Sequence, residues 1–120
     1  MRGLRVLVCG SRTWSDTGAI AKQLDPLCRK ISLIIQGGAK GADQCAKDYA
    51  EKMEIPFLTY TAEWSRYGRA AGPKRNQRML DEGKPDLVLA FHKNLDSSKG
   101  TKDMVNKAKK AGVKVLLVTE

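Results

Sequence analysis

Three glycines mark the stretch of the sequence that is best suited to approach an anion closely. Gly37, Gly38 and Gly41 follow a short apolar run and precede a helix-like pattern, with Ala39 and Lys40 between them. At such a turn the backbone can approach a phosphate, and the N-terminus of the following helix offers N–H groups and the positive end of the helix dipole. The spacing matches neither a P-loop nor the GxGxxG dinucleotide motif. The same stretch therefore also fits a tight strand-to-helix turn that binds nothing.

A second glycine turn occurs late in the chain, where Gly100 and Thr101 open the last predicted helix. The N-terminus of that helix is a second group of N–H donors for an anion. Arg12 and Arg75 add guanidinium groups, whose fork of donors suits phosphate. Together these features predict a two-loop phosphate cradle, in which the N–H groups of residues 38–41 and 100–101 hold phosphate and the two arginines neutralise it.

The residues that follow the first predicted strand are Gly10, Ser11, Arg12 and, two residues later, Trp14. Gly10 permits a tight exit from the strand, and Ser11 offers a hydroxyl and backbone N–H groups to a ligand. Trp14 could stack on a base. The alternative is that Trp14 covers the edge of the sheet while Arg12 is solvated.

Five basic residues and no acidic residue lie between Arg66 and Arg78, and Trp64 precedes them as a second candidate for stacking on a base. Arg75 and Asn76 fall in the first turn of a predicted helix. Asn76 shares a helical face with apolar residues, so we expect its side chain to point inward. A buried amide needs hydrogen-bond partners, and a phosphate or ribose could supply some of them. The alternative is a solvated basic helix with a local hydrogen bond at the asparagine.

Asp43 lies in the first turn of the helix that follows the glycines. It could accept a hydrogen bond from a ribose hydroxyl, or simply interact favourably with the helix dipole. His92 is the one histidine of the chain, and we expect it to be structural. The three cysteines are widely spaced, which predicts neither a disulfide framework nor a metal site.

The elements that would position these residues alternate along the chain. Short apolar runs predict five strands, and apolar residues three or four apart predict helices between them. The expected strands cover residues 4–10, 31–36, 55–60, 85–92 and 113–119, and the expected helices cover residues 15–31, 42–53, 73–82 and 101–111. Pro26 should kink the first helix or end it early, and residues 61–72 should form a loop.

Strict alternation with strands that are nearly all apolar predicts one α/β domain over residues 1–120. We expect a three-layer α/β/α arrangement with a mostly parallel five-stranded sheet. In such sheets ligands bind at the carboxyl ends of the strands, near the switch in strand order. All the candidate loops named above follow predicted strands, so they should meet at that edge.

The charge of the chain narrows the class of partner. The sequence has 22 Lys and Arg against 13 Asp and Glu, a net charge of +9. This charge suits a nucleotide or a nucleic acid, although solubility alone would also explain it. No apolar run approaches the roughly 20 residues that span a bilayer, and the first apolar run ends too early for a secretory signal. We therefore expect a cytoplasmic protein with no membrane partner.

Four stretches, in this order, resemble the YspA-like branch of the SLOG superfamily: CGSRTWSD, GGAKGADQCA, YGRAAGPKRNQRM and AFH…GTKDMV. The resemblance covers essentially the whole chain and implies a Rossmann-like fold. It also implies a nucleotide or nucleotide-derived ligand between the Gly37–Asp43 loop and the Gly100–Thr101 loop. The Arg75–Asn76 pair matches the RN signature of the family beside that pocket. The resemblance implies no required cofactor, and because relatives commonly assemble, a homo-oligomer stays open.

One departure from the superfamily bears on chemistry. Its LOG phosphoribohydrolases, which cleave the N-glycosidic bond of nucleoside monophosphates, carry PGGxGTxxE on the second loop, where this chain reads SSKGTKDM. Met104 takes the place of the glutamate, and Asp103 lies one residue earlier, a shift of about 100° around a helix. Asp43 or Asp103 would then have to supply the carboxylate. Nucleotide binding, as in relatives proposed to be sensors, is the leading hypothesis. An N-ribohydrolase is the first alternative, and nucleic-acid binding, as in the DNA-processing protein A family, is the second.

Overall fold

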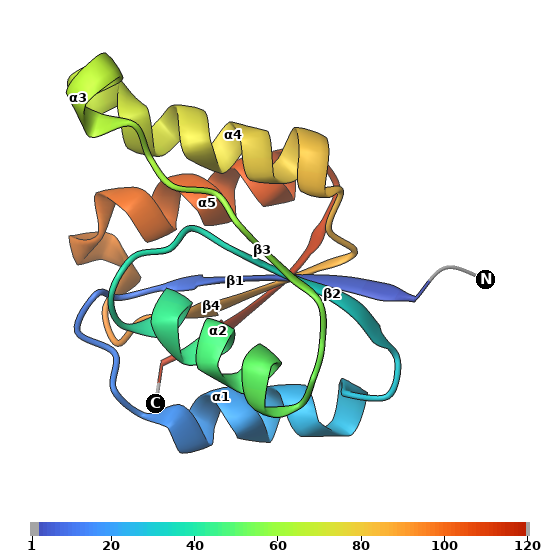
Figure 1. Cartoon of the computed structure of the whole chain (residues 1–120). Helices are drawn as coiled ribbons and strands as arrows, with labels where there is room; N and C mark the ends of the chain where they lie inside the picture. Colours follow the sequence, from blue (N-terminus) through green and yellow to red (C-terminus); the bar gives the residue numbers. More distant parts are fainter. Residues whose placement is uncertain (1–2, 120) are drawn as a thin grey trace.

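The computed structural model describes residues 3–119 and shows a sheet covered by helices (Figure 1). Along the chain the order is β1 (Leu4–Gly10), α1 (Thr17–Leu24), η1 (Asp25–Leu27), β2 (Ile31–Gln36), α2 (Ala42–Lys52), β3 (Phe57–Thr59), α3 (Trp64–Tyr67), η2 (Gly68–Ala70), α4 (Ala71–Gly83), β4 (Leu87–Phe91), η3 (Leu95–Ser97), α5 (Lys99–Lys110) and β5 (Lys114–Val118), where η denotes a 3-10 helix. No helix in this part of the chain is long and apolar enough to cross a membrane.

The five strands form one sheet in the order β3-β2-β1-β4-β5, and all four pairings are parallel. The predicted α/β fold is confirmed, and the sheet is wholly rather than mostly parallel. The chain moves outward from β1 to β2 and β3, then returns to place β4 on the other side of β1. The switch in strand order therefore lies between β1 and β4, and the crevice at their carboxyl ends is the expected place for a ligand.

Helices cover both faces of the sheet, with α1 and α2 on one side and α4 and α5 on the other (Figure 1). Alternate residues of β1 face opposite layers, as the pleat of a strand requires. Val6 and Val8 pack in the core cluster that includes residues of α1 and α2, whereas Leu7 and Cys9 pack in the cluster that includes residues of α4 and α5. Burial on both faces explains why the central strands are nearly all apolar.

The first helix ends early, as Pro26 predicted. Asp16 caps α1, because its carboxylate accepts a hydrogen bond from the Ala19 N–H at 3.0 Å. The helix ends at Leu24, and the chain continues as a 3-10 turn with Pro26 inside it. Proline cannot supply the N–H of an α-helical interior, so the chain changes its hydrogen-bond pattern at that point.

The prediction of a loop over residues 61–72 is wrong. The segment contains α3 and η2, and α4 begins at Ala71 rather than at Pro73. Pro73 is the third residue of α4, where its missing N–H still costs nothing because the first helical N–H groups have no intrahelical partner. A helix of four residues is too short to show an apolar period, so the sequence could not reveal α3.

Candidate functional site

A cleft of about 740 Å³ lies at the carboxyl ends of β1 and β4, within the size range of small-molecule sites. Its walls come from the loops that follow β1, β2 and β4 and from α3, α4 and α5. Among the described residues, the lining includes the basic side chains of Arg12, Arg69, Arg75, His92 and Lys99 and a single acidic side chain, that of Asp43. The excess of cations favours an anionic occupant.

The N-terminus of α5 points its first N–H groups toward this cleft. Ser98 caps the helix, and its hydroxyl oxygen accepts a hydrogen bond from the Thr101 N–H at 3.1 Å. The N–H groups of Lys99 and Gly100 have no acceptor in the part of the chain that the structure describes. Gly100 and Thr101 line the cleft as the sequence predicted, but the free donors there are those of Lys99 and Gly100.

The loop after β2 differs from the predicted cradle. The Gly38 N–H donates to the Gln36 side-chain oxygen at 2.6 Å, and the Ala39 N–H donates to the Asp43 carboxylate at 3.2 Å. These N–H groups are therefore already paired and are not available to a phosphate. Ala39 and Asp43 line the cleft, whereas the other residues of the predicted loop lie outside its lining: Gly37, Gly38, Lys40 and Gly41.

The glycines of this loop serve close packing instead. Gly41 has φ +81°, and a Cβ atom there would overlap the carbonyl oxygen of Ser11 in the loop after β1. A Cβ atom on Gly37 would overlap the guanidinium of Arg75. Gly10, which lines the cleft, has no room for a side chain because the Phe91 carbonyl lies against it. The glycines thus bring the walls of the cleft together.

Asp43 is buried at the cleft, with 7% of its surface exposed. Burial raises the pKa of its carboxyl group to about 6, because desolvation disfavours the charged form. The Ala39 N–H and the Arg75 guanidinium act in the opposite direction and favour the carboxylate. Asp43 is therefore the carboxylate on which the hydrolase alternative now depends.

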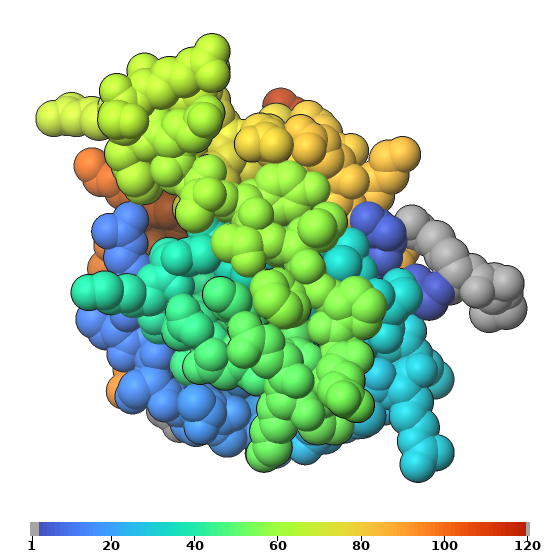
Figure 2. Space-filling model, in the orientation of Figure 1, coloured from blue at the N-terminus to red at the C-terminus, as the bar shows by residue number. Residues whose placement is uncertain are grey.

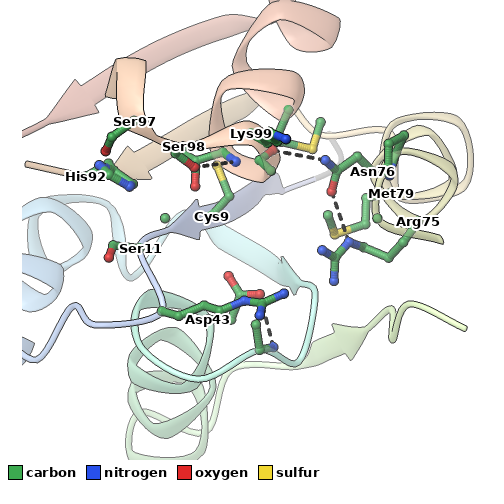
Figure 3. Close-up of a pocket in the computed structure, with 18 of the residues that line it drawn as sticks. Cys9, Ser11, Asp43, Arg75, Asn76, Met79, His92, Ser97, Ser98 and Lys99 are labelled. Atoms are coloured by element: carbon green, nitrogen blue, oxygen red, sulfur yellow. Dashed lines mark hydrogen bonds between the residues drawn. The ribbon is translucent and has the colours of Figure 1, made fainter. Parts of the chain in front are cut away.

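Arg75 and Asn76, both from α4, lie at one wall of the cleft (Figure 3). The Arg75 guanidinium donates to the Gly37 carbonyl at 2.9 Å and to the Asn76 side-chain oxygen at 3.0 Å. Burial lowers the pKa of Arg75, and the nearby Asp43 carboxylate raises it. Asn76 is 3% exposed, which confirms the expectation that its side chain points inward. The pair therefore belongs to the wall itself and is not a solvated patch.

Asp103, the other candidate carboxylate, is outside the lining of the cleft. Its two oxygens accept hydrogen bonds from the Asn76 amide at 3.0 Å and from the Lys107 ammonium at 2.5 Å. Met104, the next residue, is fully buried and lines the cleft in its place. The prediction that Asp103 could act on a ligand is wrong for this arrangement, because the helix turns its side chain toward α4.

The two tryptophans have opposite environments. Trp64, on α3, lines the cleft with half of its surface exposed, and the Arg12 guanidinium lies 5.9 Å from the centre of its ring. The segment that carries α3 projects from the molecule (yellow-green in Figure 2). Ser11 and Arg12 also line the cleft, and the Ser11 hydroxyl is paired with that of Thr13 at 2.8 Å.

Trp14 is in the core, and the expectation that it stacks on a base is wrong. It is 5% exposed, its ring lies 5.5 Å from that of Phe91, and its indole N–H donates to the Asp16 carbonyl at 3.0 Å. A buried ring with a paired N–H has no face to offer a ligand. The alternative, in which Trp14 packs over the sheet, agrees with its position.

Sequence reasoning missed or discounted several residues of the lining. Arg69 lies in η2, inside the segment that was expected to be a loop, and Lys99 was overlooked one residue before Gly100. His92, expected to be structural, lines the cleft directly after β4, and its Nδ1 accepts a hydrogen bond from the Asn94 N–H at 3.0 Å. Its position at the carboxyl end of a strand was the signal that could have identified it. Cys9 is in the floor, where burial raises the pKa of its thiol, so it is an unreactive core residue.

Comparisons with known proteins agree with this description. A model of the YspA, cpYpsA-related SLOG family matches residues 4–67, just over half of the chain. The Gene 61 protein of Mycobacterium phage D29 is 36% identical over 120 residues, which cover 93% of this chain and 94% of that protein. The X-ray structure of DNA processing protein A from Streptococcus pneumoniae is similar, with a TM-score of 0.59 at 16% identity. That match covers 98% of this chain and 59% of that one, so the likeness extends to about three fifths of the larger protein.

Proposed function

Because the chain belongs to the YspA, cpYpsA-related SLOG family, we propose that it binds a nucleotide or nucleotide-derived phosphorylated molecule in the cleft at the carboxyl edge of the sheet. One observation carries the proposal. The N–H groups of Lys99 and Gly100, which have no acceptor in the described chain, open into a cleft whose lining has four Arg or Lys side chains and one carboxylate. Such a group of donors and cations suits a phosphate.

Each wall has a separate role in this proposal. The phosphate lies at the N-terminus of α5, where Lys99 adds its charge, and Arg75 reaches it from α4. The exposed ring of Trp64 offers a face on which the base stacks. The Arg12 guanidinium, which lies over that ring, moves aside when the base binds. Asp43 accepts a hydrogen bond from a ribose hydroxyl. A ligand with both an aromatic base and a phosphate uses all of these groups.

Isothermal titration calorimetry with a panel of nucleoside mono-, di- and triphosphates tests the proposal. Arg75→Ala should weaken the best ligand at least about tenfold, because a hydrogen bond to a charged group is lost. Lys109→Ala is the matched control. Lys109 is exposed near the other end of α5, so its substitution also removes one positive charge but does so outside the cleft. Absence of binding across the panel, or equal binding by the wild type and Arg75→Ala, would rule out the proposed site.

A second candidate function, the binding of single-stranded nucleic acid, is favoured by the surface of α3 and α4. Lys74 and Arg66 lie over the ring of Tyr67 at 4.8 and 5.0 Å, and Arg78 lies over the ring of Tyr60 at 5.4 Å. Cations interleaved with aromatic rings are typical of surfaces on which bases stack while the backbone is neutralised. One solved structure that is similar to this chain is that of a DNA processing protein. The two functions differ in how steeply affinity falls with salt, because a nucleic acid is contacted at several phosphates at once.

A further inference from the structure

We propose that Asn76 is a positioning residue that holds the two phosphate-binding elements of the cleft in register. Its amide joins Arg75, on α4, to the first turn of α5. The inference rests on the proposed function, because it concerns how that site is aligned. It assigns to Asn76 no contact with the ligand and no part in chemistry.

Both hydrogens and the oxygen of the Asn76 amide have hydrogen-bond partners within the protein. Its oxygen accepts from the Arg75 Nε at 3.0 Å, and its nitrogen donates to the Gly100 carbonyl at 3.2 Å (Figure 3). The nitrogen also donates to the Asp103 carboxylate at 3.0 Å. An amide nitrogen has two hydrogens, and each has an acceptor here. These partners also determine which end of the amide is oxygen, since a guanidinium can only donate and a carboxylate or carbonyl can only accept.

On the α5 side, the contact immobilises one peptide group of the first turn. The Gly100 carbonyl accepts from Asn76, and the N–H of the same peptide group, that of Thr101, donates to the Ser98 hydroxyl. A planar peptide held at both its oxygen and its nitrogen cannot rotate. The N–H groups of Lys99 and Gly100 immediately precede it, so their direction into the cleft is set by the same contacts.

On the α4 side, the contact orients the Arg75 guanidinium. Its Nε is held by Asn76 and its Nη1 by the Gly37 carbonyl, which leaves Nη2 with no acceptor among the described residues. Two fixed nitrogens determine the plane of the group, and therefore the direction in which Nη2 presents its donors. Asn76 thus aligns the free N–H groups of α5 with the free donors of Arg75.

Asp103 and Lys107 complete the arrangement behind the cleft. The Asp103 carboxylate accepts from Asn76 with one oxygen and from the Lys107 ammonium with the other. The ion pair keeps the carboxylate where the Asn76 amide needs an acceptor. This accounts for an aspartate near the start of α5 that does not line the cleft.

A double-mutant cycle with AMP as the probe, followed by calorimetry, tests the coupling. Asn76→Ala should weaken AMP binding about tenfold in the wild type but less than threefold in the Arg75→Ala background, because part of its effect passes through Arg75. A merely structural effect would be the same fold-change in both backgrounds, and that result would overturn the proposal. Gln77→Ala, in the adjacent exposed position, is the matched control and should leave affinity unchanged.

An exchange of the two side chains tests the polarity of the amide. Asn76→Asp alone should weaken AMP binding more than Asn76→Ala, because it places a carboxylate against the Gly100 carbonyl and Asp103. Adding Asp103→Asn restores a donor between positions 76 and 103 and should recover at least threefold of the loss. Circular dichroism confirms that each variant is folded. No recovery in the folded double variant would contradict the assigned roles.

Nuclear magnetic resonance of the ligand-free protein gives an answer that does not depend on any nucleotide. The Arg75 Nε–H and the Thr101 amide should be protected from exchange in the wild type, and at least tenfold less protected in Asn76→Ala. Unchanged protection would overturn the inference even if AMP binds. The converse result is that the wild type binds no nucleotide while the Asn76→Ala variant still loses this protection. That pair of results would contradict the proposed function and leave the positioning role intact.

Discussion

At the scale of the residue, Asp43 stands out because its charge is buried beside the guanidinium of Arg75. Burial raises the pKa of its carboxyl group from 3.8 to about 6, despite the hydrogen bond from the Ala39 N–H and the charge of Arg75. The net result is a carboxylate that the folded state holds at a cost near neutral pH. Such groups are more common at sites that bind or react than elsewhere in a fold.

Asp43 should therefore make the protein less stable as the pH rises. The folded state binds the proton more tightly than the unfolded state, so the contribution of Asp43 is most favourable below about pH 4 and is lost between about pH 4 and 6. The pKa difference corresponds to roughly 3 kcal/mol in the free energy of unfolding. Urea denaturation at several pH values should show Asp43→Asn gaining about that much relative to the wild type between pH 4 and 7. Parallel pH profiles for the two proteins would show that Asp43 is not buried in this way.

Trp14 and Trp64 show which residue properties the sequence could not predict. Both follow predicted strands closely, and both have basic neighbours in the sequence. Only the tertiary contacts separate them, because Phe91 covers Trp14 while α3 carries Trp64 away from the core. The inward orientation of Asn76 was predictable because the apolar residues that share its helical face lie on the same helix, at a spacing that can be read from the sequence.

At the scale of the element, the loop after β2 owes its shape to hydrogen bonds within residues 36–43 and to close packing against the loop after β1. Gly38 and Ala39 donate their N–H groups to the side chains of Gln36 and Asp43, and Gly41 lies against the Ser11 carbonyl. The strands and helices were predictable because their periods are local. The pairing of these amides was not predictable, although their acceptors lie only two and four residues away, because it depends on the Gln36 and Asp43 side chains turning back onto the loop. Glycines at the start of a helix therefore predicted a turn correctly, but not a phosphate loop.

Replacement of Gly41 by alanine should destabilise the protein by about 2 kcal/mol or more, since the residue has φ +81° and its Cβ atom would overlap the Ser11 carbonyl. Gly100→Ala is the matched control, because a Cβ atom there meets no atom within 4 Å and the residue has helical neighbours on both sides. We expect that control to be within about 0.5 kcal/mol of the wild type, toward greater stability. Chemical denaturation measures both changes, and similar effects of the two substitutions would contradict the assigned role of Gly41.

At the scale of the whole molecule, the net charge of +9 serves two different surfaces. The cleft gathers cations around a space of about 740 Å³, which suits a small anion. The surface of α3 and α4 places cations over two half-buried tyrosine rings, which suits a longer chain of phosphates. The family and the fold are compatible with either partner, so the size of the anion becomes the quantity that separates them.

The dependence of affinity on salt concentration reports how many phosphates of the ligand the protein contacts. A single-stranded oligonucleotide that contacts Arg66, Lys74 and Arg78 should lose affinity with a slope of roughly −2 in a plot of log affinity against log salt, about −0.7 for each of three phosphates. AMP is a single nucleotide with no condensed counterions to release, so its affinity for the cleft should depend on salt much more weakly. Fluorescence anisotropy with a labelled oligothymidine gives the first slope, and calorimetry gives the second.

One variant on each surface shows which surface each ligand uses. Tyr67→Ala removes a ring over which two cations lie, and Tyr67 is not part of the cleft lining. It should weaken the oligonucleotide about tenfold, because stacking on one aromatic ring contributes roughly 1–3 kcal/mol, and it should leave AMP binding unchanged. Arg75→Ala should do the reverse. If the oligonucleotide does not bind at low salt while AMP binds, the α3–α4 surface is a solvated helix face, and the cleft is the anion-binding surface of the chain.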